Sequence, residues 1–472
     1  MHRVQSKSLW VYACLLAAAR CAESAPRPSS VVSFAPASAT VAFASDDSNG
    51  LLWTDTSNTV PEAIRGSLGA NILGPQNIPV DLENADFLAP PSTDAGTVGN
   101  AKWPFSMSHN RLQTGGWARQ QNGMSLGLHC YRTANLISPL PLSAAVLPMA
   151  TEMAGVDMRL EAGAIRELHW HSTGEWGFIL KGSVQITVVN QDGQNYLSTL
   201  NPSDVWYFPA GVPHSIQATA DLPQGAEFLL VFDSGTFSED STFLLTDWLA
   251  HVPKEVLAKN FRTDASAFAH IPAQELYIFP SAPPADNAVA PSSPQGTASL
   301  PYSFSFSKVP QTPLAGGSVR IVDSTTFKIA TTIAAAEVTV EPGAMRQVLT
   351  SLSGALHHVN TFSQGAAHEW SYYIEGTGRM SLFASSGNSR TFDFQAGDVG
   401  YVPASFGHFV ENTGNTTLRF LEIFKSDRFQ DISLQQWLAL TPPDLVKAHL
   451  DLDDETIAHL NKTKITVVAP SN

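Results

Sequence analysis

The same ordered set of short motifs occurs twice along this chain. Glu161–Arg166 reads EAGAIR and recurs as EPGAMR at Glu341–Arg346, an offset of 180 residues. Asp204–Pro209 reads DVWYFP and recurs as DVGYVP at Asp398–Pro403, an offset of 194 residues. An internal repeat of this kind predicts two domains with the same fold, one in each half of the chain.

Each half consists of short runs rich in Val, Ile, Phe and Tyr, interrupted by Gly, Pro, Asn or Asp. This pattern is typical of antiparallel strands that close into a barrel or sandwich, so we expect an all-β fold class. Trp248, Val252 and Val256 fall at helical spacing near the end of the first half, and a similar stretch begins at Leu434. Short helices should therefore follow each barrel.

The first residues have the pattern of a secretory signal. Arg3 and Lys7 precede an apolar stretch, Leu9–Ala19, which is too short to span a bilayer. A retained, buried N-terminal helix is the alternative. The predicted division of the chain is a signal peptide over 1–25, a partly disordered extension over 26–110, a first domain over 111–279, a linker over 280–300 and a second domain over 301–472.

Composition restricts the partners. The 472 residues carry a formal charge of −15 and a pI near 5.3, which argues against nucleic acid or an anionic membrane as a partner. Cys14 and Cys21 would leave with the signal, so that Cys130 alone remains and no internal disulfide is expected. Asn415 and Asn461 begin glycosylation acceptor sequences. We expect a secreted glycoprotein.

A cluster of metal-ligand types lies in the first repeat. His169 and His171 are two residues apart, so in a strand they project from one face. Glu175 follows after a short turn, and His214 follows a turn rich in Pro and Gly. Three imidazoles and one carboxylate leave two positions of an octahedral ion open, which suits Mn(II) or Fe(II) acting on a small chelating substrate. A single histidine in a barrel is more often a core residue, but four potential ligands at this spacing favour a metal site.

These segments match the two cupin motifs, G-x5-H-x-H-x3-E-x6-G and P-x-G-x2-H. From about Gly115 to its end, the chain resembles a bicupin oxalate decarboxylase. The resemblance extends to segments beyond the ligands, namely RELHWH (166–171), DVWYFPAGVPHSIQ (204–217), FSEDSTFLLTDWLAH (237–251) and GDVGYVPASFGHFVEN (397–412). One departure is that Asn201–Ser203 precedes Asp204 where the family usually has Gly.

The resemblance implies two tandem cupin domains, each a jelly-roll β-barrel with one Mn(II), that use dioxygen to split oxalate into formate and carbon dioxide. His169, His171, Glu175 and His214 would hold the catalytic metal. Arg166 would bind a substrate carboxylate, although strand periodicity does not require a residue three positions before His169 to face inward. Trp206 could help to form the oxalate pocket, but a core position is equally compatible with it.

Ser238–Ser241 matches the mobile lid of the family, in which Glu239 would carry the proton. A lid that cannot deliver this proton would favour two carbon dioxide molecules and peroxide, so oxalate oxidase is the nearest alternative. The presence of Glu239 favours the decarboxylase. The resemblance also makes a homo-oligomer built through the terminal helices possible.

The second repeat matches less completely. Glu369 and His408 correspond to Glu175 and His214, and Arg346 corresponds to Arg166. Glu422 occupies the place of the second-half glutamate that handles protons in the family. However, the offset of 180 residues places His169 and His171 at Leu349 and Ser351, and the offset of 194 places them at Ser363 and Gly365. Neither offset leads to a histidine. His357 or His358 could supply one ligand, since adjacent strand residues face opposite ways.

We therefore expect the second metal site to be incomplete, and a non-catalytic storage or structural bicupin is a further alternative. Residues 123–145 and 348–364 interrupt segments that are contiguous in the family. Our hypothesis is that one or both are intron sequence retained in translation. Removing 348–364 alone would not restore the missing histidines.

Overall fold

The computed structural model describes residues 90–108, 110–122, 132–133, 136–137, 147–348, 350–351 and 367–470. The predicted signal peptide, His357 and His358, Cys130 and most of the two predicted inserts lie outside the described residues.

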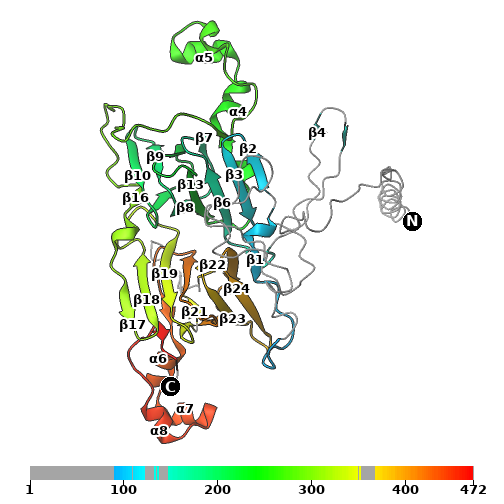
Figure 1. The fold of residues 1–472 in the computed structure, drawn as a ribbon, viewed down its shortest axis with the longest axis vertical. Helices are drawn as coiled ribbons and strands as arrows, with labels where there is room; N and C mark the ends of the chain where they lie inside the picture. The colour runs from blue at the N-terminus through cyan, green and yellow to red at the C-terminus, as the bar shows by residue number, and fades with distance from the viewer. Residues whose placement is uncertain are drawn as a thin grey trace, which may run out of the picture. The chain divides into compact units, whose positions relative to one another are not determined.

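Two antiparallel sheets form the first barrel (Figure 1). The larger sheet has the strand order β16-β11-β8-β13-β6-β3-β2, and the smaller has the order β10-β9-β12-β7-β14, with β15 also paired to β7. The strands are β2 (Asn110–Gln113), β3 (Gly116–Gln121), β6 (Ala154–Leu160), β7 (Ile165–Trp170), β8 (Glu175–Lys181), β9 (Val184–Val189), β10 (Asn195–Leu200), β11 (Val205–Phe208), β12 (His214–Ala218), β13 (Ala226–Phe232), β14 (Phe243–Leu244), β15 (Ile278–Phe279) and β16 (Ser303–Phe304).

The second barrel repeats this plan. Its larger sheet has the order β1-β25-β22-β27-β19-β18-β17, and its smaller sheet has the order β24-β23-β26-β20-β29. The strands are β1 (Lys102–Pro104), β17 (Thr312–Leu314), β18 (Gly317–Val322), β19 (Ala334–Val340), β20 (Met345–Val348), β22 (Glu369–Glu375), β23 (Thr377–Phe383), β24 (Ser389–Gln395), β25 (Asp398–Val402), β26 (Gly407–Asn412), β27 (Leu418–Phe424) and β29 (Val467–Val468). Two separate pairs join β4 (Arg132–Thr133) to β5 (Leu136–Ile137) and β21 (Thr350–Ser351) to β28 (Asp431–Ile432).

Short helices follow each barrel, α4 (Leu245–Ala250) and α5 (Lys254–Phe261) after the first, and α6 (Leu434–Ala439), α7 (Pro443–Leu450) and α8 (Asp454–Ala458) after the second. The side chain of Ser433 accepts the Gln436 N–H and caps α6, whereas α5 ends where Arg262 adopts a left-handed conformation. The predicted all-β fold of two tandem jelly-roll barrels with trailing helices is confirmed. Within the described part of the chain, none of these helices has the length and apolar character needed to cross a membrane.

The two barrels exchange their first strands. β1 precedes the first barrel in sequence but pairs with β25 of the second, and β16 pairs with β11 of the first in the same way. Each exchanged strand is followed by a short 3-10 helix, Phe105–Met107 or Phe306–Lys308. The exchange therefore ties each half of the chain to the large sheet of the other.

A shared hydrophobic core lies between the two large sheets. On β8, Trp176 and Phe178 belong to this core, whereas Ile179 belongs to the interior of the first barrel. On β22, Trp370 belongs to the shared core, and Tyr373 belongs to the interior of the second barrel. Because successive strand residues face opposite sides, these strands are apolar on both faces and hold the barrels back to back.

Phe105 provides a test of this packing. It is fully buried, and its ring centroid lies 6.2 Å from that of Trp370 and 6.0 Å from that of Tyr372. We expect Phe105→Ala to lower the free energy of unfolding by about 3–5 kcal/mol, because it opens a cavity in the shared core. The matched control, Phe383→Ala, removes a ring that is 52% exposed and should cost less than about 0.5 kcal/mol in the same denaturant titration. Equal losses in the two variants would contradict a core shared by the barrels.

Candidate metal centre

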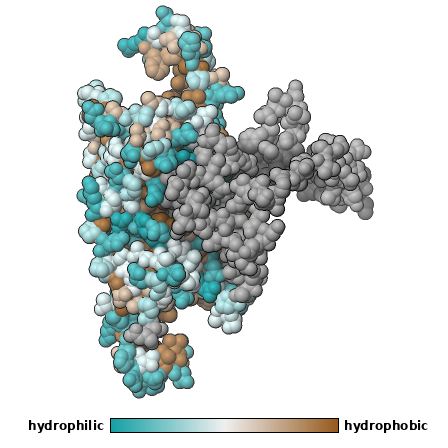
Figure 2. All heavy atoms as spheres, viewed as in Figure 1, coloured by the Kyte–Doolittle hydropathy of each residue, from teal (hydrophilic) through white to brown (hydrophobic). Residues whose placement is uncertain are grey.

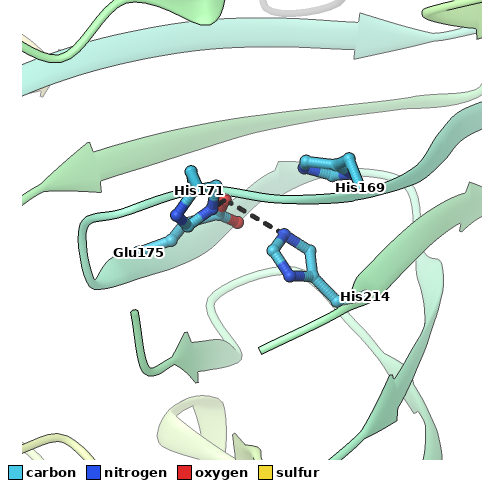
Figure 3. A group of neighbouring side chains, drawn as sticks. All are labelled: His169, His171, Glu175 and His214. Atoms are coloured by element: carbon cyan, nitrogen blue, oxygen red, sulfur yellow. Dashed lines mark hydrogen bonds and ion pairs between the residues drawn. The ribbon is translucent and has the colours of Figure 1, made fainter. Parts of the chain in front are cut away.

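Four side chains from three elements converge inside the first barrel (Figure 3). His169 lies on β7, His171 directly follows it, and Glu175 and His214 are the first residues of β8 and β12. One ligand atom from each of the four lies within 4.8 Å of the others, and all four side chains are buried. Trp170, between the two histidines, points away and stacks on Phe243 at 5.6 Å. The structure thus brings together the four predicted ligands.

Backbone carbonyls orient the three imidazole rings. Each ring nitrogen Nδ1 contacts the carbonyl oxygen of a residue two positions away in the chain. The contacts are His169 to Glu167 at 2.6 Å, His171 to Thr173 at 2.7 Å and His214 to Val212 at 2.8 Å. A carbonyl can only accept, so Nδ1 must carry the proton and Nε2 must offer its lone pair. The three lone pairs are therefore free for an ion at the common centre.

Glu175 completes the group as an anion. Its Oε2 lies 3.0 Å from Nε2 of His171 and 3.6 Å from Nε2 of His214. The Nε2 atom of His214 has no hydrogen-bond partner among the described residues. Although burial opposes ionisation, contacts with His171 and His214 lower the pKa of the Glu175 carboxyl well below its usual range. A bound cation would take over this stabilisation, because Nε2 of a neutral ring with its proton on Nδ1 has no hydrogen to donate. Trp206 donates its indole N–H to Oε1 at 2.8 Å. The predicted pocket residue Trp206 thus fixes a candidate ligand.

A β-bulge turns Arg166 to the same side as His169. On the facing strand β12, Ile216 pairs with Arg166 and His214 pairs with His169. Glu167 and Leu168 therefore oppose the single residue Ser215, and the extra residue reverses the inward and outward alternation. Burial, and then the charge of Arg166, hold the pKa of His169 well below its usual range. The guanidinium is thus close enough to influence the metal centre, which strand periodicity alone did not predict.

Arg166 and Glu239 form a buried ion pair beside this centre. Arg166 Nη2 donates to Glu239 Oε2 at 2.9 Å, and the Tyr277 hydroxyl donates to the same oxygen at 3.0 Å. Burial and the nearby carboxylate raise the pKa of Tyr277 well above its usual value, so the hydroxyl remains a donor. Nε and Nη1 of Arg166 are buried and have no hydrogen-bond partner among the described residues. They are available to a bound anion.

Sequence reasoning missed Glu167 and Tyr277. The Glu167 carboxylate accepts three backbone N–H groups, from Thr246 at 2.6 Å, Leu276 at 3.0 Å and Tyr277 at 2.8 Å. Glu167 therefore holds the segment that carries Tyr277, and its carbonyl orients His169. Tyr277 lies in no recognisable motif, more than 100 residues after β7, so no local signal would have identified it.

The second barrel places two ligand types together. His408 Nε2 lies 3.2 Å from Glu369 Oε2. Burial disfavours a charged ring, but the adjacent carboxylate raises the pKa of His408. β20 lacks the bulge of β7, and its register sets Val348 opposite His408, where β7 has His169. The strand position opposite His408 is therefore occupied by Val348, and Leu349 and Ser363 lie outside the described residues.

All three guanidinium nitrogens of Arg346 have hydrogen-bond partners, in contrast to those of Arg166. Its Nε and Nη2 bind Glu422 at 2.9 and 3.0 Å, and its Nη1 binds Asp431 at 2.9 Å. Burial raises the pKa of Glu422 even though Arg346 lies against it. Asp431, which the sequence did not single out, also contacts Lys464. In the described part of the chain, the four residues of the first barrel are the one group of three or more potential ligand residues close enough to hold an ion.

Comparisons with known proteins agree with this geometry. The model of the cupin family matches residues 147–267 and 306–458. Oxalate decarboxylase OxdC of Bacillus subtilis (strain 168) is 48% identical over 416 residues, covering 87% of this chain and 97% of the relative. A probable oxalate decarboxylase of Arthroderma benhamiae is 38% identical over 411 residues, covering 85% and 91%.

Solved structures give the same relation. A structure of oxalate decarboxylase from Bacillus subtilis at pH 4.6 has a TM-score of 0.72 and 46% identity, with 88% of this chain and 99% of that chain covered. A structure from a study of the Mn(II) centres of the same enzyme has a TM-score of 0.72 and 46% identity, covering 87% and 100%. The second barrel of the present chain nevertheless lacks a complete ligand group among its described residues.

Replacing one ligand tests the centre directly. We expect His171→Ala to reduce the affinity for a divalent metal at least about tenfold, because it removes one of four donors. The control His251→Ala changes a histidine whose side chain is 76% exposed and should not alter affinity. Isothermal titration of the metal-depleted variants with MnCl2 measures both. Unchanged affinity in His171→Ala would contradict the proposed centre.

Proposed function

From the premise that this chain belongs to the cupin family, among its bicupin oxalate decarboxylases, we propose that it converts oxalate to formate and carbon dioxide with Mn(II) in its first barrel and dioxygen as cocatalyst. The observation that carries this proposal is the buried pair of Arg166 and Glu239 beside the four-ligand group. The names of the relatives support oxalate as the substrate. The convergent Nε2 lone pairs of three histidines and the Glu175 carboxylate fit a divalent cation.

The chain's own residues would bind and orient the substrate. Manganese with dioxygen would supply a reversible one-electron oxidation of bound oxalate. The two unpartnered N–H groups of Arg166 would bind one carboxylate of the hydrogen oxalate anion. Their fork geometry matches the two oxygens of a carboxylate, so the substrate would be held in one orientation.

Glu239 would move the proton. It would take the proton from the hydrogen oxalate anion and return it to the carbon that remains after the C–C bond breaks and carbon dioxide leaves. The products are formate and carbon dioxide, with no net change in protons or electrons. Tyr277 and Arg166 hold Glu239 Oε2, and the Glu239 side chain is only 7% exposed, so water competes poorly for the reacting carbon.

We propose that the second barrel contributes structure rather than turnover. Its arginine is fully engaged by Glu422 and Asp431, and its Glu369 and His408 form a pair without a third ligand in the described residues. A metal stoichiometry of one per chain is the consequence. Oxalate oxidase remains the competing activity of the same site, and an acid at the position of Glu239 is the feature that favours the decarboxylase. The intact first site opposes a purely structural bicupin.

We also propose secretion and glycosylation. The apolar stretch Leu9–Ala19 and the acceptors at Asn415 and Asn461 support them. Amino-terminal sequencing of the protein from its native host, with glycan mapping, tests both.

Association through the helices is a further part of the proposal. Trp248, Val256 and Phe261 are more than half exposed on α4 and α5, as are Trp437 and Leu440 at α6. Figure 2 shows hydrophobic atoms on both helical segments. Apolar side chains exposed on such short helices favour burial against another copy of the chain. Sedimentation equilibrium of the purified protein would detect the homo-oligomer.

Glu239→Gln tests the assigned chemistry. Glutamine preserves the shape but cannot carry a proton, so we expect formate production to fall by about 10²–10⁴-fold. The remaining turnover should yield carbon dioxide and peroxide. Glu255→Gln, an exposed change on α5, is the control and should retain wild-type rates. Formate, carbon dioxide and peroxide are measured together from oxalate at acidic pH. Formate production by Glu239→Gln within threefold of wild type would remove Glu239 from the mechanism.

A further inference from the structure

One arginine outside the metal centre contacts three residues on the two segments that flank Glu239. Arg111 lies on β2, and its Nη1 donates to Asp240 Oδ1 at 3.0 Å. Its Nη2 pairs with Glu275, two residues before Tyr277. Its guanidinium carbon lies 3.6 Å from the centroid of the Tyr277 ring. A single side chain therefore joins the segment that carries Glu239 to the segment that carries the tyrosine bound to Glu239.

Tyr277 couples this outer arginine to the buried one. The guanidinium carbon of Arg166 lies 4.2 Å from the centroid of the same ring. Cation–π attraction to both arginines, together with the hydroxyl bond to Glu239, fixes the ring position. Displacing Arg111 would release one of these restraints and one end of the Glu239 segment at the same time.

The segment 237–241 is held in place mostly by side chains. Gln120 on β3 accepts the Glu239 N–H at 2.9 Å, and Asn122 donates to the Phe237 carbonyl at 3.4 Å. Glu239 begins a 3-10 helix of three residues, capped by Ser238. Besides the buried Arg166–Glu239 pair, the Arg111–Asp240 contact is a second, surface ionic attachment of the segment to the barrel, and the Asp240 side chain is 56% exposed. Attachments of this kind are weak enough to open and close during turnover.

We propose that Arg111 is a positioning residue that, by binding Asp240 and stacking on Tyr277, keeps the 237–241 segment closed over Arg166 and sets the ratio of formate to peroxide. This inference rests on the proposed function. When the segment is closed, Glu239 can protonate the carbon left after carbon dioxide departs. When it is open, the one-carbon fragment loses its second electron to dioxygen, so hydrogen oxalate, dioxygen and one proton give two carbon dioxide molecules and hydrogen peroxide.

The ionic part of the attachment predicts a dependence on salt. An exposed ion pair shifts an opening equilibrium by only a few-fold, and added salt screens it. The wild-type ratio of peroxide to formate should therefore rise at high ionic strength. Asp240→Asn keeps the side-chain shape and removes the charge, so it should raise the ratio about two- to fivefold at low salt and abolish the dependence on salt.

The experiment measures formate and peroxide from the manganese-loaded full chain at about 20 mM and about 500 mM KCl. It also measures amide hydrogen exchange in residues 237–242 of the same samples. We expect exchange in Asp240→Asn to be about two- to fivefold faster than in wild type at low salt. The matched control is Arg379→Met, which breaks a comparable surface pair with Asp393 in the second barrel and should change neither readout.

The outcomes separate the two proposals. If wild type produces neither formate nor peroxide, the proposed function fails, and the exchange rates still test the attachment. If wild type produces formate but Asp240→Asn matches it in product ratio, salt dependence and exchange, the role of Arg111 is overturned. Arg111→Lys retains the charge but not the planar stack, so a ratio between those of wild type and Asp240→Asn would support both contacts.

Discussion

Three hydrogen bonds from imidazole Nδ1 to backbone carbonyls organise the first barrel. Each histidine is bound to a residue two positions away, so the local backbone that positions the side chain also selects its tautomer. The consequence is that three Nε2 lone pairs and the Glu175 carboxylate face one point inside the barrel, where all four side chains are buried. Burial then favours neutral rings, and the anionic carboxylate requires a compensating positive charge. Metal binding follows from this arrangement.

The sequence predicted these four ligands because period-2 alternation places His169 and His171 on one strand face. It did not predict that Arg166 would face inward, because that depends on the bulge at Glu167 and Leu168, which is visible only in the pairing with β12. The contacts of Tyr277 and Glu167 join segments more than 100 residues apart, so no local pattern encodes them. The fold could be predicted from the sequence because the chain is duplicated and the pattern of strands and turns recurs along both halves.

The two halves differ in how their arginines are satisfied. Arg166 shares one carboxylate with Tyr277 and keeps two unpartnered N–H groups, whereas Arg346 is engaged by Glu422 and Asp431. The same strand position therefore gives a receptive site in one barrel and a closed ion-pair cluster in the other. Through the exchange of β1 and β16 and the core shared by the large sheets, the first barrel obtains one strand and part of its packing from the second.

The most direct test is anomalous X-ray scattering at the manganese absorption edge from crystals of the manganese-loaded protein. We expect one peak per chain, coordinated by Nε2 of His169, His171 and His214 and by the Glu175 carboxylate. A chain without that peak would contradict manganese binding in the first barrel. A second peak of equal height between Glu369 and His408 would contradict the assignment of turnover to the first barrel alone.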